Sequence, residues 1–550
     1  MNSTNKKMRI NSIASCMLVT AVLVFGCTDL DETELLFDQV TQDNFYTTDL
    51  EYLSAVGAAY SNLYGTFGSA DNIMPLQEVT TDEMVVPTRG PDWGDGGHWV
   101  RLQTHTYNAQ DPRPASSWDR LFAGVNNCNR LLAILEPVGT EQSQAYMTEL
   151  KALRAIYYLW LLDLFGNVPL STDFTNVTPP ANSTRTEIYN FVESELLASA
   201  PLLPKTGPAD ESTYGRVNYY TAYAALAKLY LNAKVYTGTA QWDKTIAACD
   251  EIINSGKYNL MVNYSDNFSK NNKGSTESIW VIPYDEINAR GHTIPHITLH
   301  MESQKTYNMS AQPWNGFATI QEFYESYVDP AQNPGPQGQV VGTDPAGTPT
   351  TGTVDKRLSN FIVGPQYLPD GVTPLLDNGF DATDPNGAPM VFTPHINMLQ
   401  PNAWRQSGAR IGKWEIYQGN NGQLSNDYQI FRYADILLTK AEAVARKDGN
   451  WNNAVTLAIV NQIRTTHGGV DPFVTLDADK FLAERGREMF AESQRRTDLI
   501  RFDKYNSAWR FHQADAADNL GPNGINHLNV FPIPASQLNA NPNLKQNPGY

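Results

Sequence analysis

The feature that most constrains the fold is a helical spacing of apolar residues that returns in both halves of the chain. Between residues 149 and 165, apolar side chains recur every three or four positions, and Gly166 and Pro169 close the segment. Such a stripe buries one side of a helix against a core. The sequence therefore predicts a mainly α fold. Comparable windows are Thr48 to Tyr64, Trp118 to Leu135, Thr186 to Leu197, Tyr219 to Tyr236, Trp242 to Ile253, Tyr433 to Arg446, Trp451 to Ile463 and Ala478 to Phe502.

Two regions share a layout that indicates a repeated unit. Residues 219–253 and 433–463 each combine a helix rich in small residues, a short turn containing Gly, and a second helix that begins near a Trp. Helix pairs of about 34 residues are typical of tetratricopeptide repeats, which stack on one another to bury their faces. The sequence predicts tetratricopeptide-like helix pairs, with a plain helical bundle as the alternative.

The middle of the chain has a different composition. Residues 256–426 are rich in Pro, Gly, Asn and aromatic residues and contain few helical windows. Short segments such as 278–282 (SIWVI) have strand character. We therefore expect long loops and a few short strands here, held on a helical scaffold at about 45–255 and 427–510. Because binding residues concentrate on loops that a rigid scaffold holds, this part is the expected ligand-binding region.

The first 26 residues are predicted to be a targeting segment. Lys6, Lys7 and Arg9 precede an apolar run at 13–25, which is too short to span a bilayer core of about 30 Å. The run ends in VFGC, which resembles the bacterial lipobox, in which the cysteine is acylated after cleavage. We expect a lipoprotein signal peptide over residues 1–26 and a lipid anchor on Cys27. An ordinary secretory leader is the alternative.

Charge and cysteine content narrow the class of protein. The 550 residues include 40 Lys and Arg against 58 Asp and Glu, a formal net charge of −18, so no nucleic acid is expected as a partner. Cys16 leaves with the leader and Cys27 is acylated, so only Cys128 and Cys249 remain. Both lie in helical patterns. We predict that they are buried hydrophobes and that the chain has no disulfide framework.

Signatures of catalysis, cofactor binding and metal binding were sought next. The sequence has no phosphate-binding Gly-rich loop, no His-Glu-x-x-His, no Gly-x-Ser-x-Gly and no Cys-x-x-Cys, and no cofactor is expected. His292, His296 and His300 are spaced by four residues, which would align them on a helix for a metal ion. Pro295 and the β-branched residues around it favour an extended segment, so no metal site is expected here.

Glu484, Glu488 and Arg495 would share one face if their segment were a single helix. One interpretation is a general acid/base pair. The other is an ion network in which Arg485, Arg495 and Arg496 keep the carboxylates ionised, and the number of guanidinium groups favours it. No catalytic residue is therefore predicted.

Aromatic residues in polar loops are the main candidates for binding. Trp93, Trp99 and Trp314 lie among Gly, Asn and Asp residues, with no helical stripe to bury them. An exposed indole can stack on the apolar face of a pyranose while neighbouring polar groups bind its hydroxyls. Asp82 and Arg89, just upstream, would supply such groups. We predict that these five residues bind a glycan. The alternative is that the tryptophans only pin loops to the scaffold.

Several segments together resemble one family, the SusD/RagB family of starch-binding outer-membrane lipoproteins of the Bacteroidetes. The motifs occur in the family's order and run from near Cys27 to Tyr550. The segments are LRAIYYLWLLDLFGNVPL, YGRVNYYTAYAALAKLYL, FRYADILLTKAEAVA, ERGREMFAESQRRTDLIRFDKY and FPIPASQLNANPNLKQNPGY.

The resemblance implies a single SusD-like α domain over residues 27–550, with tetratricopeptide-like helix pairs. It implies a non-catalytic protein, lipid-anchored in the outer membrane and facing the cell exterior, which binds oligosaccharides and delivers them to a SusC-like TonB-dependent transporter. Two alternatives stay open. One is a peptide-binding or transporter-gripping scaffold of the same family, and the other is a glycoside hydrolase that uses Glu484 and Glu488.

Overall fold

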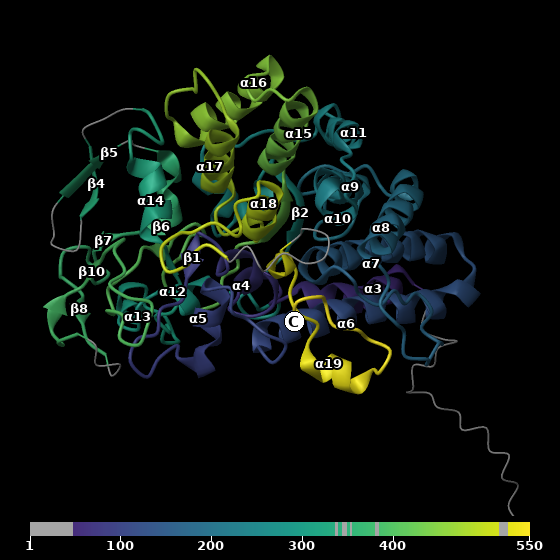
Figure 1. Ribbon diagram of the computed structural model, residues 1–550, viewed down its shortest axis with the longest axis horizontal. Coiled ribbons are helices and arrows are strands. Elements are labelled where there is room, and N and C mark those ends of the chain that lie inside the picture. Colours follow the sequence, from purple (N-terminus) through teal and green to yellow (C-terminus); the bar gives the residue numbers. More distant parts are fainter. Residues whose placement is uncertain (1–47, 336–338, 344–348, 353–354, 380–383, 516–525) are drawn as a thin grey trace, which may run out of the picture. The chain divides into compact units, whose positions relative to one another are not determined.

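Helices make up most of the regular structure (Figure 1). The structure is a computed structural model that describes residues 48–335, 339–343, 349–352, 355–379, 384–515 and 526–550. Residues Tyr52–Tyr550 form one unit by their contacts. The predicted leader and Cys27 lie outside the described residues.

The first half of the unit is a row of helices, each packed on the next. Helix α6 packs on α7, α7 on α8, α8 on α9, and α9 on α11. Gly124 lets α6 approach α7 closely, because a Cβ at this position would lie 2.4 Å from the ring of Tyr157. The elements are α3 (Asp49–Tyr60), η1 (Ser61–Leu63), α4 (Ile73–Glu78), α5 (His98–Gln103), α6 (Pro112–Leu135), α7 (Glu141–Phe165), α8 (Arg185–Ser199), α9 (Tyr219–Leu231), α10 (Ala233–Thr237) and α11 (Trp242–Ile253).

Local signals explain where these helices begin and end. Thr140 caps the start of α7 by accepting a hydrogen bond from the amide of Ser143, and Gly166, at φ +69°, ends that helix. Helix α8 begins with a capping box formed by Thr184 and Glu187. The helices predicted at 149–165 and 186–197 are thus present in the structure as parts of α7 and α8.

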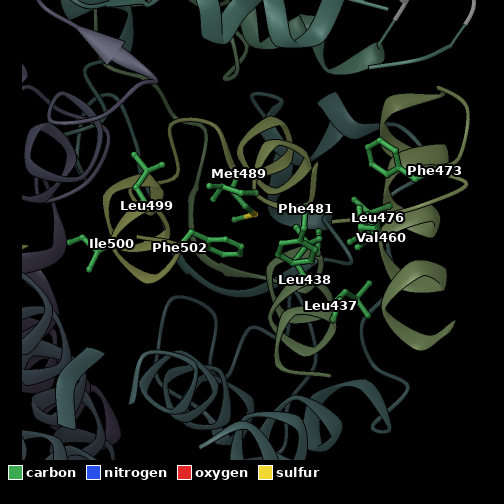
Figure 2. Packing of buried hydrophobic residues seen from close by; sticks show 14 of the residues in the cluster. Leu437, Leu438, Val460, Phe473, Leu476, Phe481, Met489, Leu499, Ile500 and Phe502 are labelled. Atoms are coloured by element: carbon green, nitrogen blue, oxygen red, sulfur yellow. The ribbon is translucent and has the colours of Figure 1, made fainter. Parts of the chain in front are cut away.

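The second half carries short helices first and a second helical group later. The two predicted helix pairs are α9 with α11 and α15 with α16, and α11 packs against α15, so the pairs stack as expected. Figure 2 shows the hydrophobic cluster under the second pair, where Phe481 stacks on Phe502 at 6.1 Å between ring centroids. The elements are α12 (Ile294–Thr298), α13 (Ser303–Thr306), α14 (Gln321–Val328), α15 (Tyr433–Asp448), α16 (Ala454–Ile463), α17 (Ala478–Met489), α18 (Arg495–Arg501) and α19 (Ala535–Ala540).

The predicted helix from Ala478 to Phe502 is wrong as a single element. Helix α17 ends at Met489 and α18 begins at Arg495. Between them Ala491 and Ser493 have φ of 61° and 59°, a backbone conformation that an α-helix cannot include. Glu484 and Glu488 therefore share a face of α17, but Arg495 belongs to a different helix and does not lie on that face.

The strands are short, and in the part of the chain that the structure describes they form two-stranded antiparallel pairs. The predicted strand at 278–282 is β2 (Ser278–Ile282), which pairs with β12 (Tyr428–Arg432). β1 (Met84–Val85) pairs with β3 (Ala318–Thr319) and so brings together two segments that precede and follow the tryptophan loops. The remaining strands are β4 (Gln339–Thr343), β5 (Pro349–Gly352), β6 (Phe361–Ile362), β7 (Gly364–Pro365), β8 (Leu376–Asp377), β9 (Ala388–Pro389), β10 (Val391–Phe392) and β11 (Arg410–Ile411).

The loop-rich middle of the chain gathers beside the helices. Figure 1 shows β4, β5, β7, β8 and β10 on one side of the unit, with α14 next to them, and α8 to α11 on the other. Among the residues described, no helix combines the length and the apolar character needed to cross a membrane.

Cys128 of α6 and Cys249 of α11 are both buried and free, which confirms their prediction as buried hydrophobes.

A buried ion network joins α17 to the loops and to β12. Glu484 lies 2.8 Å from Arg357, 2.9 Å from Arg464 and 2.8 Å from Arg487. Burial alone would raise the pKa of Glu484, but the three guanidinium groups outweigh it and lower the pKa to about 2. This carboxylate is ionised and fully paired, so the network interpretation holds, although its arginines differ from those predicted.

Glu488 occupies the same network, 2.7 Å from Arg432 and 2.8 Å from His467. His467 also lies 3.1 Å from Glu277. Burial would lower the pKa of His467, but Glu488 and Glu277 outweigh it and raise the pKa to about 9. The imidazole is therefore charged at neutral pH and belongs to the network as a cation.

This raised pKa predicts a loss of stability in mild alkali. An unfolded histidine titrates near pH 6.5, so the stabilisation from His467 is complete below that pH and disappears as the pH rises through about 9. We expect the free energy of unfolding of the wild type to exceed that of His467→Gln by about 1–3 kcal/mol at pH 6, and the difference to shrink by pH 9.5. Urea unfolding at several pH values measures it. A difference that stayed constant with pH would contradict the prediction.

Candidate functional site

A cleft of about 440 Å³ lies where the two tryptophan loops meet. Trp93, Trp99 and Trp314, three of the five predicted binding residues, line this cleft together. We call it the tryptophan cleft. The pairing of β1 with β3 places the two loops side by side, although Trp93 and Trp314 are 221 residues apart in the chain.

Trp314 offers the exposed aromatic surface of the cleft. Its side chain is 49% exposed, while His296 stacks on its ring at 4.9 Å between centroids and 18° between planes. Burial, followed by the nearby charge of Arg290, lowers the pKa of His296, so this ring is neutral at pH 7. The stack fixes the orientation of the indole and leaves its exposed part available to a ligand.

Trp93 is largely buried and holds the second loop in place. Its Nε1 donates a 2.5 Å hydrogen bond to the carbonyl oxygen of Trp314, and the two ring centroids are 6.5 Å apart. A Cβ on Gly316 would lie 2.3 Å from the Trp93 ring, so only glycine allows this approach. Trp93 therefore contributes an edge to the cleft and couples the two loops.

Trp99 forms the buried base of the cleft. It is 1% exposed, and its Nε1 donates a 2.8 Å hydrogen bond to Asp95 Oδ2. Arg113 lies over the Trp99 ring at 4.7 Å, and Phe317 meets it edge-on at 5.3 Å. The structure thus gives Trp99 the pinning role that was the alternative in the sequence analysis.

Carboxylates outnumber cations around the cleft. Asp71, Asp92 and Asp95 line it together with Arg113, which pairs with Asp71 and donates to His98 Nε2 at 3.2 Å. Burial lowers the pKa of Arg113, but a guanidinium group stays charged at neutral pH. The cleft combines an exposed indole with several hydrogen-bond acceptors, which suits a ligand with many hydroxyl groups and one apolar face.

Arg89 does not lie in this cleft, which corrects its assignment as a group that reads sugar hydroxyls. It is fully buried, and its guanidinium group donates to the carbonyl oxygens of Asn315 at 2.6 Å and Gly316 at 2.9 Å. It also donates to Trp404 at 3.2 Å and Ser407 at 3.0 Å. Arg89 thus positions the Trp314 loop, because its planar fork can satisfy several carbonyls at once.

Asp82 is also placed differently from the prediction. Its carboxylate accepts two hydrogen bonds from Arg495, each 2.7 Å long, and its side chain is 30% exposed. Asp82 is not among the described residues that line the cleft. Arg495 therefore pairs with Asp82, whereas the sequence analysis had placed it in the network of Glu484 and Glu488.

The three spaced histidines do not form a metal site with one another. The segment is not fully extended as predicted, because α12 (Ile294–Thr298) includes His296. Pro295 is tolerated there because it occupies the first turn of the helix. His292 bonds to the carbonyl of Asn426 at 3.0 Å, His296 stacks on Trp314, and His300 lies 3.2 Å from Asp377.

Sequence reasoning missed the polar residues of the cleft and the ring behind Trp314. Asp92 and Asp95 flank Trp93 in the chain, and that adjacency was a usable signal. Asp71 and Arg113 of the cleft, and His296 behind Trp314, carried no such signal, because each comes from a different part of the chain.

A second cleft of similar volume, about 460 Å³, lies near Tyr236 and His527. Its Tyr236 ring is 5% exposed and is covered by Arg185 at 4.9 Å. It offers no half-exposed indole among its lining residues. The tryptophan cleft is therefore the better candidate for stacking on a ligand.

Comparison with known proteins places the chain in a family. A family profile described as "SusD family" matches residues 276–550, and a second, described as "Starch-binding associating with outer membrane", matches residues 92–231. This chain belongs to the SusD family. The prediction made from the sequence motifs is thus confirmed.

Two individual relatives align with most of the length of this chain. The starch-binding protein SusD of Bacteroides thetaiotaomicron is 24% identical over 494 residues, which cover 86% of this chain and 84% of that protein. The SusD-like protein P38 of Formosa agariphila is 22% identical and covers 99% of this chain and 100% of its own.

Solved structures share the fold. Surface glycan-binding protein A of Bacteroides thetaiotaomicron, solved in complex with laminarihexaose, superposes with a TM-score of 0.66 at 21% identity, over 91% of this chain and 100% of that chain. The corresponding protein of Bacteroides uniformis gives a TM-score of 0.67 at 21% identity, over 91% and 99%. The predicted SusD-like, mainly α fold is thereby confirmed.

Proposed function

We propose that this protein captures oligosaccharides in the tryptophan cleft. The half-exposed indole of Trp314, held from behind by His296 and surrounded by carboxylates, is the observation that carries the proposal. A pyranose stacks on an indole through its C–H face, and its hydroxyls donate to Asp92 and Asp95. The surplus of carboxylates favours neutral glycans over sulfated or uronic-acid glycans.

We propose further that the ligand leaves uncleaved. Glu484 and Glu488, the acid/base pair of the hydrolase alternative, are fully buried. Arginines beside Glu484, and His467 together with Arg432 beside Glu488, keep both carboxylates ionised. A general acid must hold a proton and reach the glycosidic oxygen. These two glutamates meet neither requirement.

The proposed setting is the outer membrane. Residues 1–26 would be removed as a lipoprotein signal peptide, and residues 27–550 would form a single SusD-like domain anchored through Cys27 and facing the cell exterior. The protein would pass its ligand to a SusC-like TonB-dependent transporter. Support comes from the VFGC sequence and from the description of the matching family as associating with the outer membrane.

A ligand panel tests the proposal. The purified protein is titrated calorimetrically with neutral oligosaccharides, with uronic-acid oligosaccharides and with a peptide library, and each mixture is then analysed for cleavage products. We expect binding to a neutral oligosaccharide and recovery of the intact ligand. Binding confined to peptides would support the peptide-binding alternative, and released shorter sugars would support the hydrolase.

The lipid anchor gives a separate prediction. Replacing Cys27 with Ser removes the thiol that carries the acyl chains, which are each worth about 0.8 kcal/mol per buried CH₂ group. We therefore expect Cys27→Ser to leave the membrane fraction or to remain as an uncleaved precursor. Fractionation with immunodetection measures this, and Cys128→Ser, which changes a buried thiol of α6, is the control. An unchanged, processed and membrane-bound Cys27→Ser protein would contradict the prediction.

A further inference from the structure

A cluster of His105, His512 and Asp515 lies outside the tryptophan cleft. His105 follows the end of α5, and the other two residues follow α18. One ligand atom from each residue lies within 4.8 Å of the other two. The side chains are 0%, 1% and 7% exposed, in that order. We propose that this histidine cluster binds a zinc ion.

The hydrogen bonds of His105 point to a cation between its ring and Asp515. Its Nε2 lies 2.9 Å from the carbonyl oxygen of Thr80, so this nitrogen carries the proton. The other ring nitrogen, Nδ1, faces Asp515 Oδ2 at 3.0 Å, and the two atoms can share a cation. A metal ion bound by both atoms satisfies them. Zinc-binding histidines commonly donate their other N–H to a backbone carbonyl in this way.

His512 supplies the second nitrogen. Its ring is buried, and neither ring nitrogen makes a well-formed hydrogen bond among the described residues, although the backbone of Gln103 lies near. Its Nε2 lies 3.9 Å from Asp515 Oδ1. A buried imidazole with no hydrogen-bond partner among the described residues has a ring nitrogen available to a metal ion.

The donor set and its surroundings favour zinc. Two imidazole nitrogens and one carboxylate oxygen suit Zn²⁺, whereas Ca²⁺ and Mg²⁺ prefer oxygen ligands alone. Bonds of about 2.0–2.1 Å in a tetrahedron put ligand atoms about 3.3–3.5 Å apart. His105 Nδ1 and Asp515 Oδ2, now 3.0 Å apart, would therefore separate slightly, and His512 Nε2, 3.9 Å from Asp515 Oδ1, would move slightly closer. Tyr505 stacks on His105 at 4.3 Å between ring centroids, and the Trp509 ring lies 4.1 Å from the His512 ring, tilted by 31°. These contacts shield the site and orient both imidazoles.

The ion would tie the segment after α18 to the end of α5. Trp99 lies near the start of that same short helix, so the ion would also help to fix the base of the tryptophan cleft. The site itself does not depend on glycan binding, and a failure of either proposal leaves the other open to its own test.

The test is a zinc titration of chelator-treated, full-length protein in competition with a chromogenic chelator. We expect one equivalent of Zn²⁺ to bind and the melting temperature to rise with zinc concentration. Loss of an outer-shell partner lowers metal affinity 10- to 100-fold, so loss of a ligand in His512→Ala should lower it by at least about 100-fold. His395→Ala, which changes a histidine outside the cluster, should bind like the wild type.

Asp515→Asn provides a second variant of nearly unchanged volume in case His512→Ala fails to fold. Cobalt(II) provides an independent readout, because its visible absorption reports a tetrahedral site in the wild type and should change in Asp515→Asn. Absence of zinc binding by the wild type would overturn the proposal and leave a buried His–Asp ion pair. Equal affinity in the wild type and both variants would overturn it as well.

Discussion

Arg432→Ala should lower the free energy of unfolding by about 3–5 kcal/mol, the largest effect on stability expected from a single substitution here. Arg432 is fully buried and lies 3.0 Å from Glu277, 2.7 Å from Glu488 and 2.7 Å from Glu492. Removing its guanidinium group takes one cation away from three buried carboxylates, and Glu277 and Glu488 then depend more heavily on His467, which they share. Because Arg432 lies on β12 and Glu488 on α17, the contact between these elements should weaken as well.

Lys447→Ala is the matched control, since it removes a cation from an exposed ion pair. Lys447 and Asp243 have side chains that are 48% and 80% exposed, and such pairs contribute about 0–1 kcal/mol. Urea unfolding of both variants at pH 7 measures the difference. If Arg432→Ala proved no less stable than Lys447→Ala, the network would not hold the fold together as we describe.

Trp314→Ala should lower the affinity for oligosaccharide about thirtyfold or more, equivalent to about 2 kcal/mol, and should change stability little. The indole is 49% exposed, so its removal takes more from a bound ligand than from the protein core. Trp404→Ala is the matched control, because this indole is 44% exposed and is not among the described residues that line the cleft.

Isothermal titration of both variants with the best ligand of the panel gives the answer, and thermal melts check that both are folded. Wild-type affinity in Trp314→Ala would place the binding site outside the tryptophan cleft. A loss confined to Trp404→Ala would move the site toward residue 404.

Much of the fold could be predicted because helix signals are local. Helix α11 begins at Trp242 and ends at Ile253, as the spacing of its apolar residues predicted. Helices α5 and α14 were missed because six and eight residues are too few to show a clear periodicity. The break after Met489 was missed because Ala491 and Ser493 are ordinary helix residues whose positive φ depends on their tertiary surroundings.

The residues of the tryptophan cleft could be predicted only in part, because the cleft depends on contacts between distant segments rather than on local signals. The Gly and Asp residues around Trp93 and the Asn and Gly after Trp314 marked both loops. Contacts between distant segments, however, decide which side chain reaches the ligand. Arg89 looks like an exposed loop residue in the sequence, yet its carbonyl acceptors lie 226 to 318 residues away in the chain. Trp99 is buried by Phe317 and Arg113, and neither neighbour could be inferred from its sequence context.

The most direct test of the account is a crystal structure of the protein with the oligosaccharide that binds best in the panel. The account predicts a sugar ring stacked on the exposed part of the Trp314 indole, with hydroxyls bonded to Asp92 or Asp95 and with Arg89 still bound to the carbonyls of the loop. A sugar bound in the cleft beside Tyr236, with the indole of Trp314 left uncovered, would contradict it.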